Sequence, residues 1–286
     1  MLLLESLEAS VDEMVVPSLF CNRKETIISG SRHSQESMVQ KSGERERCAT
    51  GLEGLDTILY GGIPRANTIL LTGSCGTGKT SLALEFLIHG AIKGENSLFI
   101  SVTENSEKLL QNIMPYKFFD KNLIKSGRLV FVDLPIMYER LGMTKAELSM
   151  EEIDLLAAAI SDLAAELGTK RLVIDSITSV CYKLKTSEKI RDFILKLGKA
   201  LSDLNCTSIL VGEVPADSTA YSSFGVEEAI ADGIILMANM ERRGDLLRTL
   251  QVIKMRGTMH SRAKYVLDLT PMGVLLVPLL KGGSTG

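Results

Sequence analysis

The segment from Gly73 to Thr80 has the residue types and the spacing of a loop that binds phosphate groups. It matches the pattern G-x-x-x-x-G-K-[ST] at every fixed position. Glycines let backbone N–H groups approach phosphates without steric clash, and the N-terminus of a following helix adds a positive field. We therefore predict that the chain binds ATP with Mg²⁺ through the residues Gly73, Ser74, Cys75, Gly76, Thr77, Gly78, Lys79, Thr80 and Ser81.

Two residues of the loop and one distant aspartate would supply the charged and metal-binding groups. We expect Lys79 to contact the β- and γ-phosphates and to act in catalysis, and the Thr80 hydroxyl to bind Mg²⁺. Asp175 ends the apolar run 171–174. In proteins with this loop, such a carboxylate completes the metal site. The alternative interpretation of Asp175 is a helix cap.

Glu104 is the candidate catalytic base. It follows the apolar run 97–102. If that strand neighbours the strand before the loop, Glu104 would lie near the γ-phosphate and could polarise the attacking water. The alternative is a cap for a helix that starts near Ser106. Glu213 ends a similar run, 208–214, and fits a sensor of the γ-phosphate and a solvated strand end equally well.

The segment 241–265 is rich in cations, with seven basic side chains against two acidic ones. Charges of this kind usually mark a solvated strand edge. However, Lys254 and Arg256 alternate, so both would face one side of a strand. Two cations on one side could clamp a phosphate.

Strands and helices that could position these groups alternate from Thr50 onward. Ser149 with Glu152 forms a capping box for one helix, and Gly168 would end it. Parallel strands with helical crossovers give a sheet that is covered on both faces. We therefore predict an α/β fold with strands over 68–72, 97–102, 129–132, 172–174 and 208–211, helices over 79–92, 150–167 and 187–203, and antiparallel C-terminal strands over 232–238, 247–255, 263–269 and 273–278.

Composition limits the classes of function and the compartment. The 286 residues are 45 % hydrophobic and carry a net charge of −3, which gives no general attraction to nucleic acid or anionic membranes. No run approaches the roughly 20 apolar residues of a membrane span. The five cysteines are scattered without a C-x-x-C pair, which indicates a reducing cytoplasm. We expect a cytoplasmic protein without a membrane partner.

The N-terminal residues differ from the rest of the chain. We predict a poorly ordered extension over 1–46 and one ATPase domain over 47–286. Clustered apolar side chains within 2–20 could alternatively form a short amphipathic helix that docks on a partner or a neighbouring subunit.

Motifs on both sides of the loop resemble those of RecA-superfamily ATPases, and the C-terminal motifs resemble the KaiC family in particular. They are Thr50–Asp56, Gly61–Pro64, Phe224–Glu228 and Lys254–His260. The resemblance covers about residues 47–280. It implies a single RecA-like domain that assembles into rings, commonly hexamers, with ATP at the subunit interfaces. It also implies that Lys254, Arg256 and His260 reach the γ-phosphate held by the neighbouring subunit.

Two departures from the family pattern bear on activity. The family often has two adjacent glutamates where this chain has Thr103 and Glu104. Hydrolysis is therefore expected to be slow, or to depend on Glu104 alone. The double-domain clock protein phosphorylates itself on adjacent Ser and Thr, which align with Glu228 and Ala229 here. Autokinase activity is therefore not expected.

Three functions are consistent with these features. We favour a slow ATPase, homo-oligomeric and commonly hexameric, whose nucleotide state controls assembly and signalling to a protein partner. The second is a DNA recombination or repair accessory ATPase that binds single-stranded DNA. The basic segment favours that function, whereas the net charge of −3 and the aromatic content of 5 % weigh against it. The third is a scaffold that binds ATP with little turnover.

Overall fold

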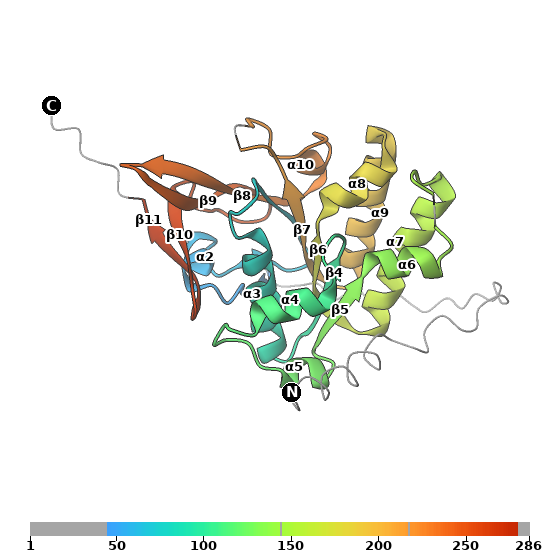
Figure 1. The fold of residues 1–286 in the computed structure, drawn as a ribbon, viewed down its shortest axis with the longest axis horizontal. Coiled ribbons are helices and arrows are strands. Elements are labelled where there is room, and N and C mark those ends of the chain that lie inside the picture. The colour runs from blue at the N-terminus through green and yellow to red at the C-terminus, as the bar shows by residue number, and fades with distance from the viewer. Residues whose placement is uncertain (1–44, 144, 217, 280–286) are drawn as a thin grey trace. The chain divides into compact units, whose positions relative to one another are not determined.

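The computed structural model describes residues 45–143, 145–216 and 218–279, and a nine-stranded sheet forms the centre of that part (Figure 1). The strand order is β11-β10-β9-β8-β3-β7-β6-β4-β5. Six neighbouring strands run parallel: β3 (Thr68–Gly73), β4 (Asn96–Ser101), β5 (Leu129–Asp133), β6 (Thr169–Asp175), β7 (Thr207–Glu213) and β8 (Gly233–Arg242). The C-terminal strands extend the sheet antiparallel: β9 (Asp245–Met255), β10 (Lys264–Thr270) and β11 (Gly273–Pro278).

The central strands are buried because helices cover the sheet. All six residues of β3 are buried, as the continuous apolar run predicts for a parallel strand covered on both faces. A separate pair of short strands, β1 (Arg47–Cys48) and β2 (Ile63–Pro64), lies antiparallel outside this sheet. The predicted α/β fold with antiparallel C-terminal strands is therefore confirmed.

The helices divide into two layers because the crossovers run in opposite directions. The crossover through α3 joins β3 to β4 and runs toward the β5 edge of the sheet. The crossover through α7 joins β5 to β6, and the one through α8 and α9 joins β6 to β7, so both run in the opposite direction. Since such crossovers are right-handed, the two groups lie on opposite faces. The helices are α2 (Glu53–Ile58), α3 (Lys79–Ile92), α4 (Ser106–Ile113), α5 (Asn122–Lys125), α6 (Leu134–Arg140), α7 (Met150–Glu166), α8 (Ile177–Leu184), α9 (Ser187–Asp203) and α10 (Glu227–Ile230).

The three longest helices begin and end where local signals predict. The Ser149 hydroxyl accepts a hydrogen bond from the Glu152 N–H at 3.2 Å, and the Ser149 N–H donates to the Glu152 carboxylate at 2.8 Å. Gly168, with φ of 58°, follows the end of α7. The helices α2, α5, α6, α8 and α10 were not predicted, because they are too short to show a repeating apolar face.

The condition attached to the role of Glu104, that its strand neighbours the loop strand, is not met. β4, which leads to Glu104, does not pair with the loop strand β3, because β7 and β6 lie between them. Sequence order does not determine strand order, and here the strands next to β3 are β7 and β8, which come much later in the chain.

The predicted extension over 1–46 falls almost wholly outside the described residues, and so does the alternative helix within 2–20. Within the part of the chain that the structure describes, no helix is long and apolar enough to cross a membrane.

Candidate nucleotide-binding site

The loop between β3 and α3 forms a turn that leaves the first turn of the helix open. Gly78, in the left-handed conformation with φ of 94°, is the N-cap residue of α3, and no side chain caps the helix. A side chain at Gly73 could not fit, because its Cβ would lie 1.9 Å from the Met237 carbonyl oxygen on β8. The glycines therefore serve close packing and a left-handed turn, and they leave the helix N-terminus available to an anion.

Lys79 supplies the cation of the loop. Its Nζ donates to the carbonyl oxygens of Gly73 at 2.9 Å and Ser74 at 2.7 Å, and the residue is 8 % exposed. Burial lowers the pKa of Lys79, and the negative charges of Glu213 and Asp175 oppose that shift. The ammonium is thus fixed inside the turn by backbone carbonyl groups.

Thr80 and Asp175 meet at the start of α3. The Thr80 hydroxyl donates to Asp175 Oδ2 at 2.6 Å. Burial raises the pKa of Asp175, and the hydrogen bond from Thr80 opposes the shift. The alternative role of Asp175 as a helix cap is wrong, because the side chain of Ser176 caps α8.

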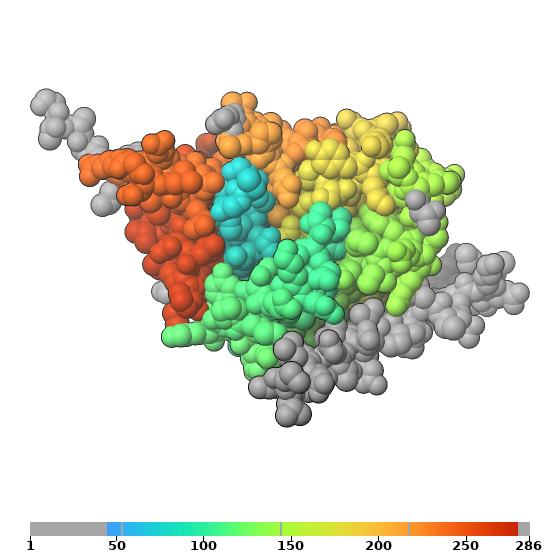
Figure 2. All heavy atoms as spheres, viewed as in Figure 1, coloured from blue at the N-terminus to red at the C-terminus, as the bar shows by residue number. Residues whose placement is uncertain are grey.

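These groups line one cavity of about 340 Å³. The segment that carries the loop and the start of α3, coloured cyan, reaches the molecular surface between the C-terminal strands in orange and red and the segment in green (Figure 2). The cavity brings the predicted cation Lys79 and the predicted metal ligands Thr80 and Asp175 together with Glu213 and with other residues of the predicted loop. Its full lining is Cys75, Gly76, Gly78, Lys79, Thr80, Ser81, Asp175 and Glu213.

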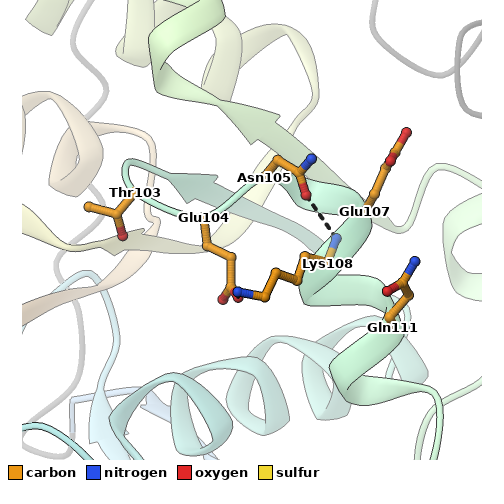
Figure 3. A pocket seen from close by; sticks show the side chains of 6 residues that line it. All are labelled: Thr103, Glu104, Asn105, Glu107, Lys108 and Gln111. Carbon is orange, nitrogen blue, oxygen red and sulfur yellow. Dashed lines mark hydrogen bonds and ion pairs between the residues drawn. The ribbon is translucent and has the colours of Figure 1, made fainter.

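Glu104 lies in a different groove, of about 620 Å³ (Figure 3). Its Oε1 is 3.0 Å from Nζ of Lys108, and the two side chains point toward each other. Asn105, not Glu104, caps α4, because its side chain accepts from the Lys108 N–H at 2.9 Å. The cap alternative for Glu104 is therefore wrong. The charge of Glu104 still raises the pKa of Asp175, although burial is the main cause.

Lys254, Arg256 and His260 lie away from the loop of their own chain. Lys254 Nζ donates to the carbonyl oxygens of Glu228 at 3.2 Å and Ala231 at 2.6 Å. Burial lowers the pKa of Lys254, and the charge of Arg256 adds to this effect. Nδ1 of His260 is 3.2 Å from the Ser261 carbonyl oxygen.

The expectation that Lys254 and Arg256 share one strand face is wrong in part. β9 ends at Met255, so Arg256 lies beyond the strand. Its guanidinium instead lies 3.4 Å from Asp232 Oδ1. Both cations nevertheless bind the same short segment, residues 228–232.

Two contacts of the site were not predicted. The Arg248 side chain on β9 donates from Nε to the Gly76 carbonyl oxygen at 3.0 Å. The Glu213 N–H donates to the Thr178 hydroxyl at 2.9 Å. Arg248 was visible only as one member of the basic segment, and nothing in the sequence indicated Thr178.

The donor set fits Mg²⁺ that is shared with phosphate oxygens. A hydroxyl and a carboxylate are the hard oxygen ligands that Mg²⁺ prefers, and this ion commonly takes its other ligands from phosphate and water. Among the described residues, no group of three or more His, Cys, Asp or Glu side chains could hold a metal without such help.

A phosphate-binding turn of this kind, at the end of a buried strand in a mainly parallel sheet, defines a P-loop nucleotide-binding protein of the RecA type. A family model described as the KaiC ATPase matches residues 48–281. The chain therefore belongs to the KaiC ATPase family and contains one ATP-binding domain of that family.

The similar proteins include short and long members of the family. A UPF0273 protein of Pyrococcus horikoshii is 35 % identical over 247 residues, which is 83 % of this chain and 97 % of that protein. The circadian clock oscillator protein KaiC of a Nostoc strain is 32 % identical over 251 residues, 87 % of this chain but 48 % of that longer protein. The crystal structure of a KaiC-like protein of Pyrococcus horikoshii OT3 aligns with a TM-score of 0.70 and 32 % identity, covering 82 % of this chain and 100 % of that one.

Proposed function

We propose that this protein is a slow ATPase whose nucleotide state controls its assembly and its signalling to a protein partner. The observation that carries this proposal is the cavity in which Lys79, Thr80 and Asp175 meet at the N-terminus of α3. A buried ammonium and an uncapped helix N-terminus favour a phosphate chain in this cavity.

Each of these groups has a defined task in the proposed site. The Lys79 ammonium would exchange its bonds to loop carbonyl groups for phosphate oxygens. Thr80 and Asp175, already 2.6 Å apart, would hold Mg²⁺ directly or through water. When bound, Mg²⁺ reduces the negative charge of the β- and γ-phosphates.

Glu104 is the proposed base for hydrolysis, and its position agrees with slow turnover. Thr103 stands beside it instead of a second carboxylate, and Lys108 neutralises it at 3.0 Å. A carboxylate in an ion pair is a weaker acceptor for the proton of an attacking water. Glu104 would therefore have to leave Lys108, at least in part, before it can act.

The register of the sheet supports a contact between subunits for Lys254, Arg256 and His260. Met255 on β9 pairs with Gly233, the first residue of β8, whereas the loop follows Gly73, which pairs with Met237. The two cations therefore lie at the opposite end of the sheet from the loop of their own chain. They could reach a nucleotide only in another copy of the protein, as a ring would allow.

Three of the seven cations of the basic segment lie at two separate places, which favours the switch over single-stranded DNA binding. Arg248 bonds to the loop at Gly76, whereas Lys254 and Arg256 bond to residues 228–232. A surface that tracks a nucleic-acid backbone needs a continuous row of cations with aromatic platforms.

The test of ATP binding is the substitution Lys79→Ala, because Lys79 is the only cation among the described residues that line the cavity. We expect calorimetry to show ATP·Mg²⁺ affinity reduced about a hundredfold or more, the effect of losing a buried charge-assisted contact. Lys93→Ala, an exposed lysine just after the same helix, is the matched control. Unchanged affinity in Lys79→Ala would contradict the proposed site.

Alkylation of Cys75 gives an independent readout of occupancy. Cys75 is exposed in the loop, whereas Cys48, Cys181 and Cys206 are buried. Mass spectrometry of peptides should show that ATP·Mg²⁺ slows alkylation of Cys75 in the natural protein but not in Lys79→Ala. Equal alkylation rates with and without nucleotide would place ATP elsewhere.

A further inference from the structure

With Glu213, the side chains that line the phosphate cavity carry two negative charges and one positive charge, and Arg248 lies next to this lining, at Gly76. Of the residues that line this cavity, Lys79 is the cation, and Asp175 and Glu213 are the carboxylates. A triphosphate is itself strongly anionic. A second carboxylate is therefore unexpected in a cavity that binds one, unless it has a task.

The sheet places Glu213 beside the loop. It is the last residue of β7, and β7 lies between the loop strand β3 and the strand β6 that ends at Asp175. Its backbone is held on both sides, since its N–H donates to Thr178 and its carbonyl oxygen accepts from the Ser223 hydroxyl. The backbone of Glu213 is therefore held beside the loop, and its side chain is exposed at the end of the strand.

The carboxylate of Glu213 differs from that of Asp175 in its partners. Asp175 accepts a hydrogen bond from Thr80. The Glu213 side chain accepts none from any other described residue. The side chain is exposed and acts on the cavity through its charge.

We propose that Glu213 is a specificity-determining residue that opposes metal-free triphosphate, so that ATP binds more tightly when a divalent cation at Thr80 and Asp175 reduces the charge of the phosphates. The inference deepens the proposed function, on which it rests. ADP carries less negative charge than ATP, so its affinity should depend less on the carboxylate of Glu213. Glu213 is exposed, which agrees with the solvated strand end that the sequence left open, and the same residue also lines the cavity.

The test is a set of calorimetric titrations with ATP and ADP, each in excess Mg²⁺ and each in EDTA. In EDTA, Glu213→Gln should bind ATP about tenfold more tightly than the natural protein, the effect of removing one like charge at a partly screened site. The gain for ADP should be smaller. In Mg²⁺, the two proteins should differ by less than about threefold in ATP affinity.

Controls separate charge from shape. Glu213→Asp keeps the charge and should behave like the natural protein, and Glu107→Gln removes an exposed carboxylate from the other groove and should change nothing. Glu213→Ala tests the same charge loss should the glutamine variant unfold in thermal melts. Equal ATP affinity of natural and neutral variants in EDTA, or an equal gain for ATP and ADP, overturns the inference. Natural protein that binds neither nucleotide in Mg²⁺ overturns the proposed function itself.

Discussion

Lys79 and Glu104 lie in different pockets, so substitutions at the two positions should separate nucleotide binding from turnover. Lys79 is buried against the loop carbonyl groups, whereas Glu104 is an outer group that interacts with Asp175 only through charge. Binding therefore depends on the residues nearest α3, and hydrolysis on a residue that follows β4, three places along the sheet from β3.

Glu104→Gln should bind ATP with nearly natural affinity and lose hydrolysis. The amide keeps the shape of the side chain but cannot accept a proton, which commonly lowers turnover by about 10²–10⁴-fold. Phosphate release and calorimetry on the same preparation measure the two effects. Glu107→Gln in the same groove is the control, and an unchanged turnover rate in Glu104→Gln would remove Glu104 from the mechanism.

Among the elements, an ionic network joins α3 to β6 and so connects the loop to the strand that carries Asp175. Arg171 on β6 is 1 % exposed, and it bonds to Glu95 at 2.5 Å and to the Phe86 carbonyl oxygen on α3 at 2.9 Å. Arg65 lies 2.8 Å from the other oxygen of Glu95. Burial alone would raise the pKa of Glu95, but the two guanidinium groups outweigh it and hold the pKa below the ordinary 4.5.

Glu95→Gln should destabilise the protein at neutral pH by about 2 kcal/mol, because it leaves the buried Arg171 without its counter-charge. Since the folded pKa of Glu95 is depressed, its stabilisation is present above the unfolded value near 4.5 and is lost as the pH falls through the folded value. Urea unfolding of the natural protein and of Glu95→Gln at pH 7 and at pH 3 measures the loss of stability and its dependence on pH.

The difference between the natural protein and Glu95→Gln should therefore shrink at the lower pH. Glu147→Gln serves as the control, because its exposed pair with Lys189 should affect the free energy of unfolding very little. A loss in Glu95→Gln that is the same at both pH values would argue against an ionic origin.

At the scale of the whole molecule, the separation of Arg256 from the loop of its own chain predicts assembly that depends on ATP. The Arg256 side chain is 54 % exposed and only loosely paired to Asp232 at 3.4 Å, so it is available to a second copy. The mass in solution should rise with ATP·Mg²⁺, and Arg256→Ala should weaken this rise.

Light scattering with and without ATP·Mg²⁺ measures the assembly, and Arg262→Ala in the same basic segment is the matched control. Full-size assemblies of Arg256→Ala in ATP would refute the contact between subunits. The same measurement with single-stranded DNA distinguishes the repair function, because only that function predicts a complex that weakens steeply with salt.

The sequence determined the features that depend on neighbouring residues. The loop, its helix from Lys79 to Ile92, the capping box of α7 and the stop at Gly168 all follow from patterns a few residues long. Local backbone sterics and hydrogen bonds act over that range, so these features could be predicted from the chain alone.

The tertiary structure decided which strand ends lie together. Pairing between strands far apart in the chain placed Glu213 beside the loop and Glu104 after a strand three places from β3. It also brought Arg248 onto Gly76 and left Lys254 at the far end of the sheet. Each of these strands is an apolar run with similar local preferences. Their order depends on how the whole sheet packs, a property that no short stretch of residues contains.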